Sequence, residues 1–196
     1  MSRDKILAAL QQNQPELVPL PSTLSFERDE SLNLVEKFKV MAEGIGSKVY
    51  VVAGFEEIAT VIGMDFPNEK RIVSAVPELA TDAIPAFLLN ESPHTYESVD
   101  VAIFKPRIAV AENSALWITE DRMGVRALPF ITQHIVMLVD VATLVPDMHA
   151  AYLQIGDADY GFSTFIAGPS KTADIEQSLV LGAHGPRSMT IFLYGK

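Results

Sequence analysis

The stretch Gly168-Pro169-Ser170-Lys171-Thr172-Ala173-Asp174-Ile175-Glu176 determines how the C-terminal part of the chain is interpreted. An apolar run at 162–167 precedes it, and a second one at 189–194 follows Gly182 and the triplet His184-Gly185-Pro186. Short apolar runs bounded by glycine and proline are typical of buried strands. We therefore predict a strand, a glycine turn, a helix ended by Gly182 and a second strand, which together form a βαβ unit.

The first turn of this predicted helix carries Ser170, Lys171 and Thr172. A helix N-terminus presents unpaired N–H groups and a partial positive charge, so these residues can bind a small anion or a phosphate group. Asp174 and Glu176 in the same turn already neutralise part of that charge. Two interpretations stay open: an anion site at residues 170–172, or hydroxyl groups that only cap the helix.

The region from residue 47 onward alternates between apolar runs of strand length and segments of helical periodicity. Such alternation predicts an α/β fold with a largely parallel sheet and helices on both faces. The predicted helices cover 56–62 and 146–153, and the predicted strands or apolar segments cover 49–52, 71–73, 99–104, 107–111, 115–119 and 135–139.

The N-terminal part of the chain reads as a helical extension. Apolar residues at helical spacing predict helices at 2–12 and at about 28–43, and prolines at 15, 19 and 21 exclude regular structure between them. We expect residues 1–46 to form this extension and residues 47–196 to form the α/β domain. The extension is expected to cover an edge of the sheet, with a lid or an oligomer contact as alternatives.

Composition excludes several classes of function. The chain has 196 residues, 48% of them apolar, and a net charge of −10, which disfavours nucleic acid as a partner. It contains no cysteine, so disulfides, thiolate catalysis and Cys-bound iron–sulfur clusters are excluded on this chain. The sequence has neither a signal-peptide pattern nor an apolar run of about 20 residues, so a cytoplasmic location without a membrane span is expected.

Motifs for metals and cofactors are missing. Gly44 and Gly46 follow a predicted helix and precede a strand, which is the reverse of a dinucleotide fingerprint. The four histidines lack metal-ligand spacing, so we predict no metal site and no bound cofactor. His184 belongs to the turn that leads into the last strand, where it can bond a carbonyl group or line a pocket.

A second polar segment, Glu112-Asn113-Ser114, lies between two apolar runs. A polar turn between buried strands often faces a cleft at the end of a sheet, although a plain surface turn has the same pattern. We expect this acidic turn to meet residues 170–172 at one cavity. Glu112 is then the candidate catalytic residue, and Asn113 and Ser114 are candidate ligand-binding residues.

The block 168–176, together with His184-Gly185-Pro186, resembles the signature of LUD-domain proteins, the lactate utilisation protein C or YkgG-type group. The resemblance is close over about residues 99–194. At the central turn the family has a sequence like Glu-Thr-Gly-Thr, whereas this chain has Glu112-Asn113-Ser114-Ala115 and lacks the glycine. The resemblance implies a fold like that of ribose-phosphate isomerases, CoA-transferases and formyltetrahydrofolate cyclo-ligases.

The resemblance also implies a role in oxidising L-lactate to pyruvate in a complex with two iron–sulfur proteins. On this hypothesis the chain is an accessory subunit that binds a small anion and depends on its partners for electron transfer. An alternative is a free-standing transferase or ligase for a CoA-, nucleotide- or folate-type substrate, with Glu112 as nucleophile or base. A third is a site inactivated by the changes at Asn113 and Ser114. The sequence does not decide whether the chain forms a homo-oligomer.

Overall fold

The computed structural model describes residues 2–19, 32–79, 92–173 and 179–195. Two units are compact by themselves, residues 1–31 and residues 32–196. The first contains α1 (Arg3–Gln12), which has no buried residue and exposes Ile6, Leu7 and Leu10. The second contains the remaining helices and all the strands. The division predicted after residue 46 stays a prediction, while α2 (Leu34–Gly44) already packs within the second unit.

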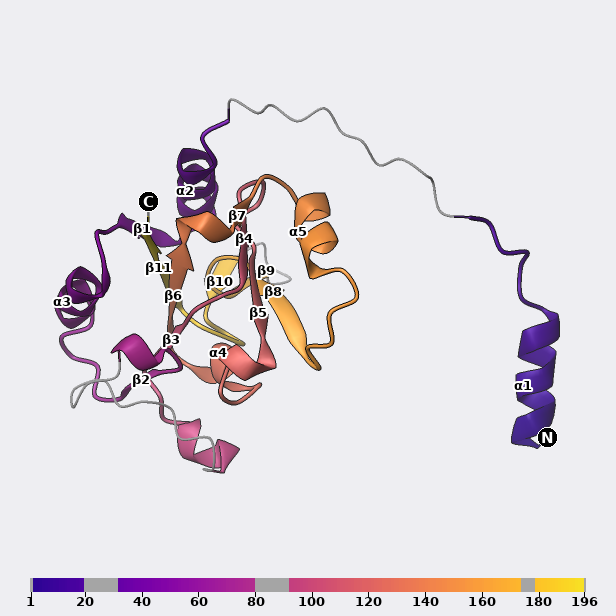
Figure 1. Ribbon diagram of the computed structural model, residues 1–196. Helices are drawn as coiled ribbons and strands as arrows, with labels where there is room; N and C mark the ends of the chain where they lie inside the picture. The colour runs from indigo at the N-terminus through magenta and orange to yellow at the C-terminus, as the bar shows by residue number, and fades with distance from the viewer. Residues whose placement is uncertain (1, 20–31, 80–91, 174–178, 196) are drawn as a thin grey trace. The chain divides into compact units, whose positions relative to one another are not determined.

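A five-stranded parallel sheet forms the centre of the second unit (Figure 1). Its strands are those that the apolar runs predicted, so the largely parallel α/β fold is confirmed. Four pairings, all parallel, give the order β1-β11-β6-β3-β2. The strands are β1 (Lys48–Val51), β2 (Ile72–Ser74), β3 (Val101–Phe104), β6 (His134–Asp140) and β11 (Ser188–Tyr194).

A second, four-stranded sheet packs against the first. Its order is β7-β4-β5-β8, with β4/β5 and β5/β8 antiparallel and β4/β7 parallel. The strands are β4 (Ile108–Val110), β5 (Leu116–Thr119), β7 (Leu144–Val145) and β8 (Ser163–Ile166). The sequence predicted β4, β5 and β8 as apolar segments but gave no sign that they form a separate sheet.

Side chains alternate between two cores because successive residues of a strand point to opposite faces. In β3, Val101 and Ile103 pack with α3 (Phe55–Asp65), whereas Ala102 and Phe104 pack with α2 and the second sheet. Figure 1 shows α3 on one side of the parallel sheet and the second sheet on the other.

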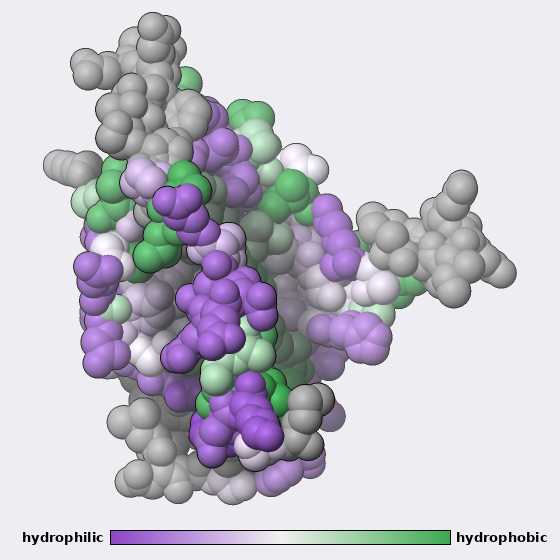
Figure 2. Space-filling model, turned by 90° about the vertical axis from the view of Figure 1, so that its right-hand side faces the viewer, coloured by the Kyte–Doolittle hydropathy of each residue, from purple (hydrophilic) through white to green (hydrophobic). Residues whose placement is uncertain are grey.

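The outer face of the second sheet carries α5 (Met148–Ile155). Asp147 caps the N-terminus of this helix, since its carboxylate accepts the N–H of Ala150. The helix buries Ala151 and Ile155 in a cluster that includes Trp117. The remaining helical turns are α4 (Leu128–Ile131), η1 (Pro77–Leu79), η2 (Pro93–Tyr96), η3 (Glu120–Arg122) and η4 (Val141–Thr143). On the face seen in Figure 2, hydrophobic residues lie scattered among hydrophilic ones.

The helix predicted between Ser170 and Gly182 is wrong. Residues Lys171–Ala173 form β9 and Leu179–Leu181 form β10, an antiparallel pair with Lys171 opposite Leu181. Residues 174–178, where the predicted helix carried its acidic first turn, lie outside the described part of the chain. Two glycines have positive φ here: Gly168, at 71°, precedes β9 by three residues, and Gly182, at 73°, directly follows β10. Ser170–Thr172 therefore do not lie at a helix N-terminus, and among the described residues no helix end supplies N–H groups to an anion there.

Candidate functional site

Ser170 joins two segments of the predicted site through its backbone. Its N–H donates to the carbonyl of Pro186 at 2.9 Å, and its carbonyl accepts from the N–H of Gly182 at 3.0 Å. Residues 182–186 therefore form a loop whose two ends are both bonded to Ser170. We call Gly168–Thr172 together with residues 182–186 the loop cluster. A regular helix would have separated Ser170 from His184, whereas the hairpin brings their segments together.

Glycine 185 allows this loop to approach Ser170. A Cβ atom at that position would lie 3.0 Å from Ser170 Cβ and 3.2 Å from its Oγ, which is tighter than an ordinary contact. Pro186 is buried, and His184 between these anchored residues is exposed. The backbone of the loop is thus fixed while the imidazole of His184 remains open to solvent.

Lys171 lies beside the turn that follows α2. Its Nζ is 3.8 Å from the place where a Cβ of Gly46 would stand, and Gly46 has a φ of 95°. Gly168 is even closer to this turn, since a Cβ there would lie 2.9 Å from Ile45 Cδ1. The loop cluster therefore packs against Ile45 and Gly46, just before the amino end of β1.

The turn between β4 and β5 has a specific geometry. Asn113 Oδ1 accepts the N–H of Ala115 at 3.0 Å, and Ser114 is buried with a φ of 55°. This left-handed conformation is the one that glycine adopts without strain, and serine occupies it here. The chain therefore keeps the left-handed turn that favours glycine, although Ser114 stands where the family sequence has glycine.

Glu112 contacts the N-terminus of α5. Its Oε2 accepts the N–H of Met148, the first residue of the helix, at 3.0 Å. A carboxylate is stabilised at this end of a helix by the free N–H groups and the partial positive charge. Glu112 thus positions α5, and its role as a nucleophile or base stays a prediction.

Strand register relates the turn at 112–114 to the loop cluster. The last pair between β5 and β8 is Leu116 with Ile166, so Ser114 and Gly168 each lie two residues beyond that pair. Both predicted segments therefore lie at the same end of the second sheet. A cavity shared by Glu112–Ser114 and Ser170–Thr172 stays a prediction.

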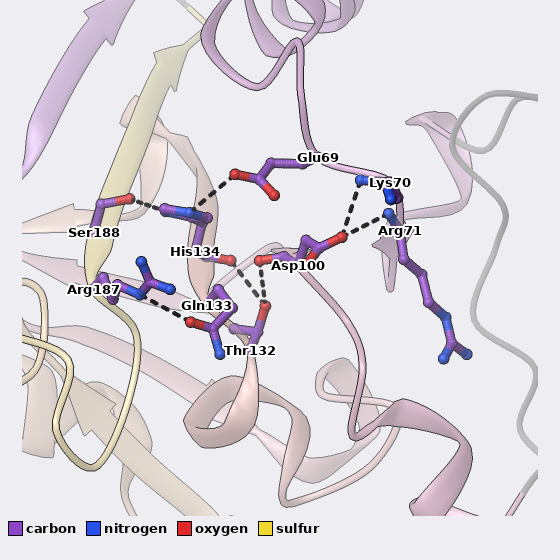
Figure 3. A network of polar contacts seen from close by, with 9 residues as sticks. All are labelled: Glu69, Lys70, Arg71, Asp100, Thr132, Gln133, His134, Arg187 and Ser188. Carbon is purple, nitrogen blue, oxygen red and sulfur yellow. Dashed lines mark hydrogen bonds and ion pairs between the residues drawn. The ribbon is translucent and has the colours of Figure 1, made fainter.

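A polar network that the sequence did not predict lies next to the loop cluster (Figure 3). Arg187 follows the loop directly, and it donates from its N–H to the carbonyl of Gln133 and from Nε to Gln133 Oε1. Ser188 Oγ lies 2.7 Å from His134 Nδ1, and Glu69 Oε1 lies 3.4 Å from His134 Nε2. His134 and Ser188 are the first residues of the adjacent strands β6 and β11, each one residue before the predicted apolar run, and nothing in the sequence indicated that these strands are paired in register.

A cavity of about 270 Å³ lies at this edge, lined by Gly46, Lys48, Asp65, His134 and Ser188 among others. Lys48 Nζ lies 2.7 Å from Asp65. The hydrogen bond to Asp65, then that to Tyr50, raises the pKa of Lys48 above its ordinary value. Any stability from this shift is present below the unfolded pKa of lysine and is lost as pH rises through the folded pKa. Because the Lys48 side chain is 56% exposed, solvent screens most of this contribution to stability.

Replacing Ser114 by glycine is expected to raise the free energy of unfolding by about 1 kcal/mol, because glycine removes the left-handed strain. Both variants lose the bond from Ser114 Oγ to the carbonyl of Asn113, but Ser114→Ala also keeps the strained φ, so it should be neutral or destabilising. Urea unfolding of the two variants checks this. A stabilised alanine variant together with an unchanged glycine variant would contradict the assigned conformation.

Within the described residues, no group of three or more His, Asp or Glu side chains is arranged to hold a metal ion. The helices of the same residues include none with the length and apolar character that a bilayer span requires.

Comparison with known proteins gives consistent matches. The family model of the LUD domain matches residues 74–194. Lactate utilization protein C of Oceanobacillus iheyensis is 34% identical over 100 residues, which cover 48% of this chain and 43% of that protein. The protein of the same description from Geobacillus kaustophilus is 32% identical over 89% of this chain and 81% of its own length. The match to the first of these relatives thus spans less than half of its length.

A solved structure supports the fold. The crystal structure of a DUF162 family protein from Deinococcus radiodurans superimposes with a TM-score of 0.62 at 18% identity, covering 83% of this chain and 96% of that chain. At this identity the likeness concerns the fold alone.

Proposed function

Because this chain belongs to the LUD domain family, we propose that it acts in lactate utilisation, as a subunit without an iron–sulfur cluster in the oxidation of L-lactate to pyruvate. The similarity to proteins described as lactate utilization protein C, one of them matched over 89% of this chain, is the observation that carries the proposal. The oxidation removes two electrons and two protons from L-lactate, so an electron acceptor must take part.

The composition supports a complex in which other subunits transfer the electrons and this chain binds the ligand. With no cysteine, this chain has no thiolate ligands for an iron–sulfur cluster. We therefore propose that iron–sulfur partner subunits carry the electrons and that this chain contributes a site for a small anion. Docking on those partners occurs in the cytoplasm in this account.

The anion site is proposed at the loop cluster and the turn at 112–114. Ser170, Lys171, Thr172 and His184 come from the cluster, and Asn113 and Ser114 come from the turn. Lys171 supplies the positive charge that a carboxylate ligand needs in a chain of net charge −10. The support from geometry is the pair of backbone bonds by which Ser170 holds both ends of the 182–186 loop.

Deletion of the gene tests the role in lactate utilisation. The deletion strain is expected not to grow on L-lactate as sole carbon source, to grow normally on pyruvate, and to recover when the gene is restored. Pyruvate is the matched control because it is the product of the proposed oxidation. Normal growth of the deletion strain on L-lactate would refute the proposal.

Co-purification tests the partners separately. An affinity-tagged chain isolated from lactate-grown cells is expected to bring down proteins that contain iron and acid-labile sulfide. A tagged chain that restores growth on lactate but isolates without such proteins would refute the proposed partners and leave the role in lactate utilisation standing.

A further inference from the structure

A large cavity lies at the other end of the second sheet from the loop cluster. Its volume is about 750 Å³, within the range of roughly 300–1,000 Å³ that is usual for small-molecule sites. Trp117 and Tyr160 line it, with their rings edge to face at 5.2 Å between centroids. Trp117 is 6% exposed, so its indole is held firmly in the wall. An apolar aromatic wall of this kind suits a planar ring.

Polar groups fixed in position surround the aromatic wall. Arg107 Nε donates to Thr119 Oγ1 at 2.8 Å, and Arg107 Nη2 lies 2.6 Å from Asp121 Oδ2. The hydroxyl of Thr119 donates in turn to Asp121 Oδ1 and closes the ring of contacts. Burial raises the pKa of Asp121, but the hydrogen bonds from Thr119 and Arg107 outweigh this effect, so the pKa lies below its ordinary value. Asp121 is therefore an ionised acceptor at neutral pH.

Gly161 allows a second acceptor to reach this region. Its φ of 63° is the left-handed conformation that favours glycine, and a Cβ there would lie 2.1 Å from Glu120 Oε1, so the flexible carboxylate of Glu120 would have to shift. Glu120 is itself paired with Arg126. Glu120, Asp121 and Asp159 line the cavity and can accept from hydroxyl or amino groups of a ligand.

A second cavity, of about 450 Å³, adjoins the first, since Asp121 lines both. Lys105 and Arg122 line this second cavity, beside Ala75 and Val76. Lys105 follows the last residue of β3, and Ala75 follows the last residue of β2. The second cavity therefore lies at the carboxyl ends of two parallel strands, where open α/β sheets bind their ligands.

We propose that the two adjoining cavities form one site for a nucleoside phosphate. The base lies against Trp117 and Tyr160, the ribose hydroxyls donate to the carboxylates around Asp121, and the phosphates lie at Lys105 and Arg122. The order of these groups follows from the balance of charge. Three carboxylates face one cation, Arg107, in the aromatic cavity, whereas Lys105 and Arg122 offset Glu78 and Asp121 in the second cavity. The site is separate from the loop cluster and does not depend on the role proposed in lactate utilisation.

Trp117 is the only tryptophan of the chain, so its fluorescence reports on this cavity directly. Titration with ADP is expected to change the Trp117 emission with saturation, and calorimetry of the same mixture is expected to give the same affinity. No saturable signal by either method at millimolar ADP would overturn the proposal.

Charge variants test the orientation of the nucleotide. Lys105→Gln is expected to weaken ADP binding about tenfold while leaving adenosine binding unchanged, because only ADP carries the phosphates. Lys70→Gln, an exposed lysine at the opposite, amino edge of the parallel sheet, should bind ADP like the unaltered protein. Arg122→Gln provides the same comparison if Lys105→Gln does not fold by circular dichroism. An equal loss for ADP and adenosine, or an equal loss in Lys70→Gln, would overturn the assignment.

Discussion

Replacing Lys171 by alanine is expected to abolish growth on L-lactate in a strain where the altered chain is the only copy. Lys171 is the one lysine or arginine among the proposed anion ligands, and its Nζ lies 3.8 Å from the place where a Cβ of Gly46 would stand. A hydrogen bond to a charged group contributes about 1.5–3 kcal/mol, so losing it should weaken anion binding by roughly ten- to a hundredfold. Growth rate on L-lactate, with growth on pyruvate as reference, measures the effect.

Two further variants make this result specific. Lys171→Arg keeps the charge and should retain part of the growth, whereas Lys70→Ala removes an exposed lysine that is not among the proposed anion ligands and should grow normally. The level of each protein in the cell is compared by immunoblot, so that loss of folding is recognised. Normal growth of the Lys171→Ala strain would indicate that the proposed anion site is not functional. This is the third hypothesis, a site inactivated by the changes at Asn113 and Ser114.

Replacing Phe104 by alanine is expected to lower the free energy of unfolding by about 3–5 kcal/mol, the usual cost of removing a buried aromatic side chain. Phe104 is fully buried at the end of β3, in the same core cluster as Ala109 and Leu116 of the second sheet. The loss combines the transfer free energy of the ring with the cavity left between the two sheets. Urea unfolding followed by circular dichroism measures it.

Phe130→Ala is the matched control, because the same atoms are removed from a side chain that is 41% exposed. Its cost should stay near 1 kcal/mol or below. Equal costs for the two variants would contradict the packing of the second sheet on the first through Phe104.

The parallel sheet could be predicted because its strands are short apolar runs with clear boundaries. The run 135–139 became β6 (His134–Asp140), and 189–194 became most of β11 (Ser188–Tyr194). Glycines also gave reliable boundaries: α2 ends at Gly44, and Gly46 has a positive φ. Burial on both faces requires nearly continuous apolar residues, and this requirement is visible in the sequence.

The hairpin of β9 and β10 could not be predicted in the same way. Each strand has three residues, too few to distinguish a period of two from a helical period. The sequence predicted a helix that ends at Gly182, but Leu179 belongs to β10. Non-local bonds fix this segment, above all those of Ser170 with Gly182 and Pro186, and local propensity does not reveal them.

The residues of the candidate site could be predicted from sequence motifs, but their positions relative to one another depend on how the strands pair. The sequence indicated Ser170, Lys171 and His184 but placed His184 at the far end of a helix. The register of β5 with β8 brings the turn at 112–114 to the same end of the sheet as Gly168. His134 and Ser188 were not predicted as a pair, because their contact depends on the parallel register of β6 with β11.

The most direct test of the proposed anion site is a titration of the 21.4 kDa chain with L-lactate, followed by nitrogen-15 NMR spectra. Amide shifts are expected to concentrate at residues 168–172 and 182–186 and at the turn 112–114, and to disappear in Lys171→Ala. The indole signal of Trp117, in the separate cavity, should not move with lactate. Shifts confined to other residues, or no shifts at millimolar lactate, would contradict the proposed anion site.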